Sequence, residues 1–550
     1  MKKVVIVGGV ATGASTAARL RRLDETVEII MFEKGEYISF ANCGLPYYIG
    51  DVIEERQNLL VATPKLMKDR FHIDVRTNSE VIQLDTHSKK LTVQSKDKGT
   101  YEESYDFLVL APGAKPLMPP IPGIKSDKIF TLRNIEDTDR IKAATEHIRS
   151  AIVIGGGYIG IEMAENLREK NMNVALVEAA PHILAPFDED LVAIAEKEMK
   201  DKGVQLFLNN GVKAFSDAID GVEVELASGT RLKAEIVISA MGVAPDTAFI
   251  KDTGIQLGAR GHILTNDKME TSVPGVYAGG DAVEVVDFVN GTQTAIPLAG
   301  PANKHGRIIA DNISGLSTTY KKTQGTTVIK VFDLTLAATG NNERTLMRLG
   351  IPYQVIIIHP NNHASYYPGA SQITLKLLFN NEGKILGAQA LGYEGVEKRI
   401  DVIATTLRLG GTVYDLTELE LSYAPPFGSG KDPVNFAGYV AENILTGKSD
   451  VVHPREINHI KEDDQIVIMD VRSLPERERG KVKGSIYINV NELRSQLDTL
   501  DKDKEYWIHC AVGIRAYVAE RMMKQHGFKC KNVTGGYKTM QFVVDQSKLD

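Results

Sequence analysis

Two segments of the chain share one order of elements: an apolar strand, a glycine-rich turn, a helix, a second strand and an acidic residue that ends that strand. The first segment is VVIVGGVATGASTAARLRRL, with Glu33 closing VEIIMFE, and the second is AIVIGGGYIGIEMAENL, with Glu178 closing VALVE. A turn of this kind aims free backbone N–H groups and the positive end of a helix at an anion. The pattern therefore predicts two doubly wound α/β domains that each bind the pyrophosphate of a dinucleotide.

The second turn fits the full G-x-G-x-x-G pattern through Gly155, Gly157 and Gly160. Glu178 follows 18 residues after the last glycine, where a carboxylate can bind both ribose hydroxyls. A 2′-phosphate would be repelled by Glu178, and the following VEAAPHIL offers no arginine. The second site is predicted to bind NADH, with NADPH as the less favoured alternative.

The first turn is less regular, because Val10 stands where the middle glycine is usual. Two later features strengthen the prediction of a dinucleotide site at this turn. Glu33 follows 20 residues after Gly13, and YAGGDA contains Asp281, which could hold the ribityl or phosphate region of a flavin. The first site is therefore predicted to bind FAD. The residues assigned to it are Gly8, Gly9, Ala11, Gly13, Glu33, Gly280 and Asp281.

Composition excludes several other classes of protein. The chain has 550 residues, enough for several domains, and its 64 basic and 71 acidic residues give a net charge of −7, which argues against a nucleic-acid surface. No apolar run reaches 18 residues and the apolar start is too short for a signal peptide, so neither a membrane span nor secretion is expected. Three cysteines, Cys43, Cys510 and Cys530, cannot form a disulfide framework, which favours a reducing cytosol.

The domain order is that of an FAD module interrupted by an NADH module and then resumed. Residues 1–450 resemble, along most of their length, the flavoprotein reductases with two dinucleotide-binding domains, including LVLAPGAKP at 108–116. NILTGKSDVVHP is interpreted as a linker to a small α/β domain. The predicted boundaries are 1–149 and 271–325 for the FAD domain, 150–270 for the NAD(P)H domain, 326–446 for a dimerisation domain and 455–550 for the last domain.

Cys43 stands alone in SFANCGLPYYIG. Relatives of the glutathione reductase type carry two cysteines that cycle as an internal disulfide, so a single cysteine requires a disulfide with an outside thiol or an oxygen adduct. The single-cysteine branch includes NADH peroxidase, NADH oxidase and coenzyme A disulfide reductase. Ala11 occupies the position where the oxygen-using relatives carry a histidine, and the Cys43 segment resembles coenzyme A disulfide reductase more closely. We expect the helix start and the flavin face to stabilise a Cys43 thiolate.

Coenzyme A needs cations for its phosphates and a path to the reactive sulfur. Arg19 and Arg22 are spaced to share one face of the first helix, and Ser39 and Asn42 flank Cys43. The resemblance to coenzyme A disulfide reductase adds further residues to this substrate site, namely Ser15, Asn303 and Lys431.

Reduction of a disulfide also needs a proton for the departing thiolate, and tyrosines in HASYYPGAS and LSYAPPFGSGKDPVN are the candidate donors. Coenzyme A disulfide reductases use two tyrosines from the partner subunit. The resemblance implies that Tyr367 and Tyr423 fill this role, with Tyr366 as the rival of Tyr367, and that a homodimer shares its active sites.

The strand YWIHC delivers Cys510 into CAVGIR, a loop that ends at Arg515 and precedes a helix. Inward-pointing N–H groups make such a loop an anion cradle that lowers the cysteine pKa. Protein tyrosine phosphatases place five residues between cysteine and arginine; the four residues here favour sulfur as the occupant. The domain resembles rhodanese domains through IMDVR, which contains Asp470 and Arg472, and through NVTGGY. A catalytically inactive rhodanese-like module is the alternative, and Cys530 is interpreted as a structural or surface thiol.

These features together resemble the coenzyme A disulfide reductase–rhodanese fusion proteins. The expected fold class is α/β, with two Rossmann-like domains, an α+β dimerisation domain and a rhodanese-like domain. The resemblance implies an FAD-dependent NAD(P)H oxidoreductase that reduces coenzyme A disulfide, persulfide or polysulfide through a Cys43–coenzyme A mixed disulfide, with a sulfurtransferase at Cys510 and no metal. An NADH oxidase and a redox-sensing sulfur carrier remain the alternatives.

Overall fold

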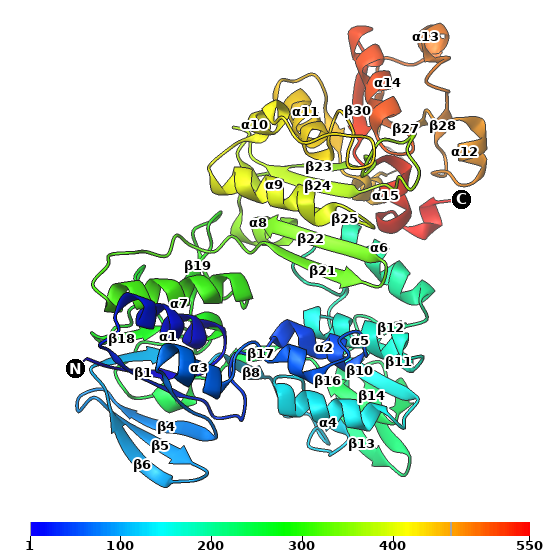
Figure 1. Ribbon diagram of the computed structural model, residues 1–550. Helices are drawn as coiled ribbons and strands as arrows, with labels where there is room; N and C mark the ends of the chain where they lie inside the picture. Colours follow the sequence, from blue (N-terminus) through cyan, green and yellow to red (C-terminus); the bar gives the residue numbers. More distant parts are fainter. Residues whose placement is uncertain (1, 462–464) are drawn as a thin grey trace. The chain divides into compact units, whose positions relative to one another are not determined.

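The computed structural model describes residues 2–461 and 465–550 (Figure 1). The chain divides into two compact units, Met1–Ile183 with Lys202–Gly325 and Leu184–Asp201 with Thr326–Asp550. The short segment Leu184–Asp201 therefore packs with the second unit, although the sequence places it within the segment 150–270. Among the described residues, no helix is long and apolar enough to cross a membrane.

The first unit contains a parallel five-stranded sheet built around the first glycine turn (Figure 1). Its central strand KVVIV is apolar because both of its faces are buried. If the five strands are numbered 1 to 5 in the order in which the chain forms them, their order across the sheet is 3-2-1-4-5, read from the edge strand at residues 74–76. This is the order of a Rossmann half. In spatial order they are β18 (Val276–Ala278), β7 (Phe107–Leu110), β1 (Lys3–Val7), β2 (Glu28–Phe32) and β3 (Asp74–Arg76).

A second parallel sheet in the same unit surrounds the second glycine turn. Its strands are, in spatial order, β12 (Gln205–Phe207), β11 (Asn173–Val177), β10 (Ser150–Ile154), β16 (Ile236–Ser239) and β9 (Ile129–Phe130). Two antiparallel three-stranded sheets extend this unit: β4 (Ser79–Asp85), β5 (Lys90–Ser95) and β6 (Gly99–Ser104), and β13 (Val212–Ala218), β14 (Gly221–Leu226) and β15 (Arg231–Ala234). Two-stranded pairs are β8 (Ala114–Pro116) with β17 (Val243–Pro245) and β19 (Val285–Val286) with β20 (Gln293–Thr294).

The helices of the first unit connect these strands and place the candidate site residues. Helix α3 begins at Pro64 because the Thr63 side chain accepts a hydrogen bond from the Leu66 N–H, leaving proline at a position that needs no donor. The helices are α1 (Ala11–Leu23), α2 (Leu45–Ile49), α3 (Pro64–Phe71), α4 (Ile135–Thr145), α5 (Tyr158–Glu169) and α7 (Ala299–Ile313). Short 3₁₀ helices are η1 (Asn42–Gly44), η2 (Arg56–Leu59), η3 (Ala248–Ile250) and η4 (Gly280–Ala282).

The second unit contains an antiparallel five-stranded sheet (Figure 1). Its strands are, in spatial order, β21 (Thr327–Val331), β22 (Leu334–Gly340), β25 (Ile385–Gly392), β24 (Thr374–Phe379) and β23 (Gln354–Ile358). Helix α9 (Val396–Arg408) buries Val396, Ile400, Ile403 and Leu407, which recur at helical spacing. The other helices here are α6 (Glu189–Asp201), α8 (Glu343–Leu349), α10 (Val413–Glu418) and α11 (Pro433–Leu445).

The last part of the second unit is a small α/β domain with a parallel sheet. In spatial order its strands are β26 (Val451–Val452), β30 (Lys529–Val533), β29 (Glu505–His509), β27 (Ile466–Asp470) and β28 (Ile486–Tyr487). Its helices are α12 (Leu474–Glu478), α13 (Leu493–Gln496), α14 (Ile514–Gln525) and α15 (Gly536–Val543), with the 3₁₀ helices η5 (Pro454–His459), η6 (Leu497–Thr499) and η7 (Gln546–Lys548).

The small domain covers the edge strand β23 of the antiparallel sheet. The Thr534 hydroxyl accepts a hydrogen bond of 2.8 Å from the Ile357 N–H and donates one of 3.1 Å to the Ile357 carbonyl. His359, just beyond the strand, is buried and shares a hydrogen bond of 2.9 Å with the Thr539 hydroxyl. These contacts satisfy backbone groups that an edge strand would otherwise expose.

A buried lysine joins the elements of the second unit. The Lys376 ammonium, fully buried on β24, lies 2.7 Å from Asp190, 2.5 Å from Glu343 and 3.0 Å from Asp188. Burial alone would raise the pKa of Asp190, but the charge of Lys376 and a hydrogen bond to His453 hold it well below its usual range. A charge this deeply buried is tolerated because three carboxylates surround it.

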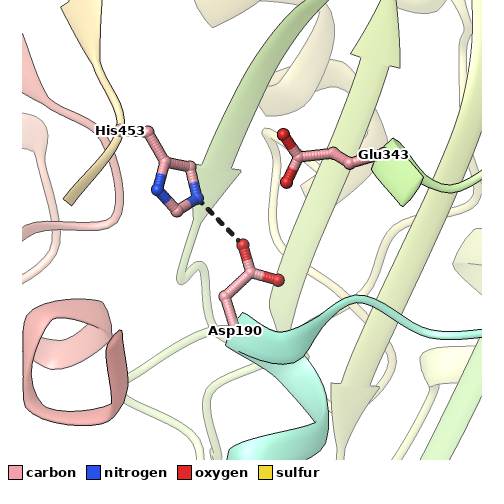
Figure 2. A group of neighbouring side chains, drawn as sticks. All are labelled: Asp190, Glu343 and His453. Carbon is pink, nitrogen blue, oxygen red and sulfur yellow. Dashed lines mark hydrogen bonds and ion pairs between the residues drawn. The ribbon is translucent and has the colours of Figure 1, made fainter. Parts of the chain in front are cut away.

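The same group has the composition of a metal site, because Asp190, Glu343 and His453 point toward one another (Figure 2). His453, which precedes η5, bonds to Asp190 at 3.1 Å, and Arg455 bonds to Glu343 at 2.8 Å. Lys376 supplies the positive charge that these carboxylates need. We therefore interpret the group as an ion-pair network that fastens the small domain to the antiparallel sheet.

Replacement of this lysine tests the network. Lys376→Met is expected to destabilise the second unit by about 3–5 kcal/mol, because it leaves the buried carboxylates without a cation. Trp507 is the single tryptophan of the chain and is buried in the small domain, so its fluorescence during urea unfolding reports the change. The exposed Lys384→Met serves as control and should shift stability by less than about 0.5 kcal/mol. Equal unfolding midpoints for the two variants would contradict the network.

Candidate active sites

The two glycine turns have nearly the same backbone geometry. Gly8 and Gly155 adopt φ values of +99° and +109°, which favour glycine. A Cβ at Gly8 would lie 2.0 Å from the Ala111 carbonyl oxygen, and one at Gly155 would lie 2.2 Å from that of Ala240. Both positions therefore require glycine so that the turn can cross the neighbouring strand end.

The last glycine of each turn is required for a similar reason, and the middle one is not. A Cβ at Gly13 or at Gly160 would lie 1.9 Å from the carbonyl oxygen of the first glycine of its own turn. At Gly157, by contrast, a Cβ would meet nothing within 4 Å. Val10 occupies the matching position of the first turn, so the protein itself tolerates this departure from the motif.

Each turn carries its acidic residue at the predicted position. The Glu33 carboxylate accepts hydrogen bonds of 2.9 Å from the N–H groups of Gly9 and Gly35. Glu178 accepts in the same way from Gly156 at 2.6 Å and from Ala180 at 2.7 Å. Both turns thus present open backbone beside an oriented carboxylate, as a dinucleotide site requires.

Asp281 lies in η4, after β18 of the first sheet. Burial raises its pKa, while Arg133 and His262 act in the opposite direction. The Gly280 N–H donates to Nδ1 of the buried His305, whose Nε2 has no hydrogen-bond partner within the described structure. These orphaned and buried polar groups fit a polar ligand that lies along the end of the first sheet.

Cys43 lies in η1, just before α2, and is exposed. Burial of its surroundings raises the pKa of the Cys43 thiol, and the carboxylates of Glu162 and Asp281 raise it further. These two carboxylates therefore oppose the thiolate, and the stabilisation predicted from the helix start and the flavin face would act against them.

Glu162, on α5, was not identified from the sequence. Burial and the neighbouring Glu165 raise the pKa of Glu162 to about 7. Its carboxylate therefore changes charge near neutral pH, and it acts on both Cys43 and Tyr47. A titrating group of this kind beside a reactive thiol is typical of active sites.

A cavity of about 460 Å³ brings together most of the predicted substrate residues. Helix α1 contributes Ser15, Arg19 and Arg22, and the Ser15 hydroxyl bonds to Asn303 of α7 at 2.5 Å. The full lining is Ala14, Ser15, Ala18, Arg19, Arg22, Ser39, Val61, Ala62, Leu66, Met67, Phe71, Asn303 and Arg307. The cavity thus combines apolar and cationic surface, which suits a ligand with both characters.

The arginines of this cavity differ in their charge balance. Arg19 is paired with Asp311 at 2.5 Å, so its charge is largely neutralised. Arg22 and Arg307 are exposed, and Arg307 was not predicted as a site residue. Asn303 and Arg307 are four residues apart on α7 and so share one helix face.

Two other predicted residues lie outside this lining. Asn42 precedes Cys43, and its buried side-chain oxygen lacks a hydrogen-bond partner in the described structure. A bound group could supply the missing donor. Lys431 belongs to the second unit, where it is exposed.

The candidate tyrosines lie on two neighbouring loops of the second unit. The hydroxyl groups of Tyr366 and Tyr423 are 3.0 Å apart, and this hydrogen bond raises the pKa of Tyr366. The ring of Tyr367 instead forms a T-shaped contact with the ring of His363, with centroids 5.8 Å apart. The structure therefore joins Tyr423 to Tyr366, the rival candidate to Tyr367.

A buried ion pair holds the two tyrosine loops together. Arg399 bonds to Asp432 at 2.9 Å and donates to the Asn362 carbonyl at 2.8 Å. The Ala364 N–H also donates to the Gly428 carbonyl. All three tyrosine side chains remain accessible, which allows them to meet a substrate or a second subunit.

Cys510 follows β29 and is fully buried. Its sulfur accepts a hydrogen bond of 3.1 Å from the Gly513 N–H. The following NVTGGY turn closes over the loop, because the Tyr537 and Lys538 N–H groups donate to the carbonyls of Cys510 and Ala511. The loop therefore directs a backbone donor at the sulfur, as expected for an anion cradle.

Two ion pairs of the last domain involve residues of its motifs. Asp470 binds Arg472 at 2.7 Å, in agreement with their joint occurrence in IMDVR. Arg515 lies in the first turn of α14 rather than in the loop itself, and it forms a two-point ion pair with Glu476 at 2.6 and 2.7 Å.

Cys530 is buried, and burial raises its pKa to about 12, which supports a structural thiol over a surface one.

Comparison with known families decides the identity of this arrangement. Residues 2–306 match the family described as pyridine nucleotide-disulphide oxidoreductase, and residues 326–432 match the dimerisation domain of that family. The chain belongs to the pyridine nucleotide-disulphide oxidoreductase family. Residues 453–541 of this oxidoreductase match the rhodanese-like domain. These matches confirm the predicted resemblance and fold class.

Individual relatives of the oxidoreductase agree with this assignment. A coenzyme A disulfide reductase of Staphylococcus haemolyticus is 36% identical over 449 residues, which is 81% of this chain and 100% of the relative. A coenzyme A disulfide reductase of Staphylococcus aureus is 38% identical over 447 residues, 80% of this chain and all of the relative.

Two solved structures span nearly the whole oxidoreductase. The reduced CoADR-RHD of Bacillus anthracis is 50% identical with a TM-score of 0.97, covering 100% of this chain and 99% of the other. The NAD-dependent persulfide reductase of A. fulgidus is 35% identical with a TM-score of 0.91, covering 98% and 99%. The chain therefore shares its fold with both proteins over nearly its whole length.

The action of Glu162 on Cys43 of the oxidoreductase can be tested by alkylation. Glu162→Gln removes a negative charge that opposes the thiolate, so the Cys43 pKa is expected to fall and the pH midpoint of reaction with iodoacetamide to move to lower pH. Mass spectrometry of the Cys43 peptide measures the rate. Glu169→Gln, about two helical turns along α5, is the control and should leave the midpoint in place. A midpoint unchanged in Glu162→Gln would exclude this coupling.

Proposed function

We propose that this oxidoreductase uses NADH to reduce the S–S bond of coenzyme A disulfide or coenzyme A persulfide, and that its rhodanese-like domain transfers sulfane sulfur on Cys510. The cavity that gathers Ser15, Arg22, Ser39 and Asn303 carries the proposal. Its exposed guanidinium groups suit phosphates, and its apolar wall suits a ligand with a neutral arm. The names of the Staphylococcus, Bacillus and A. fulgidus relatives support the same substrate class.

The two glycine turns fit the two dinucleotides of this reaction. The first turn, with Glu33 and Asp281, would hold FAD, and the second, with Glu178, would hold NADH more readily than NADPH because its carboxylate repels a 2′-phosphate. FAD would supply electron transfer from NADH to the sulfur of Cys43. The residues of the turns would bind and orient these groups, since α1 and α5 begin at the turns and the first N–H groups of a helix have no partner within it.

Cys43 would carry the covalent chemistry. Its thiolate attacks one sulfur of coenzyme A disulfide, which forms a Cys43–coenzyme A mixed disulfide and releases one coenzyme A thiolate. Two electrons then break the mixed disulfide and return Cys43 and a second coenzyme A thiolate. With coenzyme A persulfide, attack on the sulfur bonded to carbon releases hydrosulfide and forms the same mixed disulfide.

The departing thiolate requires a proton, for which Tyr423 with Tyr367 or Tyr366 is the proposed source. Because these tyrosines lie on accessible loops of the dimerisation domain, they would reach the Cys43 site of a second chain in the proposed homodimer. The hydrogen bond between Tyr366 and Tyr423 supports Tyr366 as the pairing residue. A reducing cytosol is the compartment in which these thiols function.

Substitution of Cys43 tests the covalent step. Cys43→Ser is expected to reduce NADH oxidation by coenzyme A disulfide and by coenzyme A persulfide at least about a thousandfold, because the mixed disulfide cannot form. Steady-state absorbance at 340 nm measures both reactions, and the Cys530→Ser variant is the control. Full activity of Cys43→Ser would refute the mechanism. Rapid oxygen consumption without any coenzyme A compound would instead support an NADH oxidase.

The cavity arginines provide a separate test of the substrate. Arg22→Ala and Arg307→Ala are each expected to raise KM for coenzyme A disulfide about tenfold with little change in kcat, because each removes a charged phosphate contact. KM for pantethine, which has the same disulfide without nucleotide phosphates, should not change. Arg70→Ala, on α3 outside the cavity lining, is the control. Equal effects on both substrates would assign the cavity to another ligand.

A further inference from the structure

We infer that the Cys510 loop accepts sulfur from thiol-bound persulfides and rejects dianionic donors such as thiosulfate, and that Glu476 determines this specificity. The inference rests on the proposed sulfurtransferase function and names its donor class. The arginine that follows the loop is already paired with a carboxylate within the domain.

The ion pair between Arg515 and Glu476 is the central observation. Both guanidinium nitrogens of Arg515 contact the Glu476 carboxylate, at 2.7 and 2.6 Å. Hydrogen bonding to Glu476 raises the pKa of Arg515, and the Cys510 sulfur acts on the same guanidinium. The cation next to the reactive sulfur is therefore already neutralised by a two-point contact that suits a carboxylate as well as it would suit an oxyanion.

Glu476 is held in place by its own helix. Its carboxylate also accepts from the N–H and hydroxyl groups of Ser473, at 3.0 and 2.6 Å, which completes the capping box of α12. The carboxylate is thus fixed by three groups. A donor anion that needed Arg515 would have to displace an acceptor that is already well oriented.

Other basic side chains in the described part of the domain also have partners. Arg472 and Arg477 both bond to Asp470, at 2.7 and 3.3 Å. Burial lowers the pKa of His509 to about 4, so its ring is neutral at physiological pH. Lys538 follows the closing turn, and its ammonium donates to the Gln372 side-chain oxygen at 2.7 Å.

The two donor classes make different demands on this loop. When the Cys510 thiolate attacks the outer sulfur of R–S–SH, a Cys510–S–SH persulfide forms and a single thiolate, R–S⁻, leaves. With thiosulfate, the same attack breaks the S–S bond, leaves a Cys510 persulfide anion and releases sulfite with two negative charges. Backbone N–H groups can stabilise the first reaction, whereas the second needs an uncompensated cation.

The Glu476→Gln variant isolates the charge of this ion pair. Glutamine can still accept from Ser473 at the same capping position, so α12 should persist, while Arg515 loses its anionic partner. Glu478→Gln, on the same helix but exposed, makes the same change of charge away from Arg515 and is the matched control. Cys510→Ser sets the background of uncatalysed transfer.

The experiment measures thiocyanate formed from cyanide with either coenzyme A persulfide or thiosulfate as donor, using the full-length protein. Wild type and Glu478→Gln are expected to use the persulfide and to show only background with thiosulfate. Glu476→Gln is expected to raise kcat/KM for thiosulfate at least about tenfold and to change the persulfide value less than about threefold. NADH-dependent reduction of coenzyme A disulfide should be the same in all four proteins.

Each other outcome overturns a specific claim. Wild-type activity with thiosulfate, or a folded Glu476→Gln without gain on thiosulfate, overturns the assignment of specificity and leaves the sulfurtransferase function intact. Absence of Cys510-dependent transfer from both donors overturns the sulfurtransferase function and with it the inference. If Trp507 fluorescence shows that Glu476→Gln unfolds, Glu476→Asp takes its place, because a shorter carboxylate weakens the two-point contact, and the absence of any gain then overturns the assignment.

Discussion

A single buried ammonium group determines how the second unit is assembled. Lys376 projects from the antiparallel sheet, its partners Asp188 and Asp190 lie at the start of α6, and Glu343 begins α8. His453 and Arg455 lie in the segment that leads into the rhodanese-like domain, and they bond to Asp190 and Glu343 of the same group. Since a buried charge is tolerated only when all of its partners are present, these elements have to come together cooperatively. The tyrosine loops and the Cys510 loop therefore belong to one folded body.

The fold was largely predictable from local sequence patterns. A glycine turn between an apolar strand and a helix identifies a Rossmann half wherever it occurs, since Gly8 and Gly13 are required by contacts within a few residues and one neighbouring strand. The strands around Lys376 and helix α9 were equally visible as apolar runs. The placement of Leu184–Asp201 was not, because it depends on ion pairs and a backbone hydrogen bond between residues about 150 to 190 positions apart.

The candidate sites were predictable as single residues but not as sets of interactions. Sequence placed Arg19 and Arg22 on one helix face, yet only the fold shows that Asp311 neutralises Arg19 while Arg307 joins the cavity. The sequence also identified Arg515 as a cation of the Cys510 loop, but it did not identify Glu476 as the partner of Arg515. The S-x-x-E spacing from Ser473 to Glu476 was a visible capping signal, and Asn303 and Arg307 were a visible i,i+4 pair. Glu162 left no comparable signal, because its altered pKa arises from burial and from Glu165.

The contact between Thr534 and Ile357 has a consequence for the reductase portion alone. Strand β23 reads QVIII and forms one edge of its sheet, and the rhodanese-like domain provides the groups that bond to this edge. A chain shortened to residues 1–446 would present a bare, β-branched edge to solvent, which is a template for intermolecular strand pairing. By covering this edge, the rhodanese-like domain protects the reductase portion from self-association, whether or not Cys510 carries sulfur.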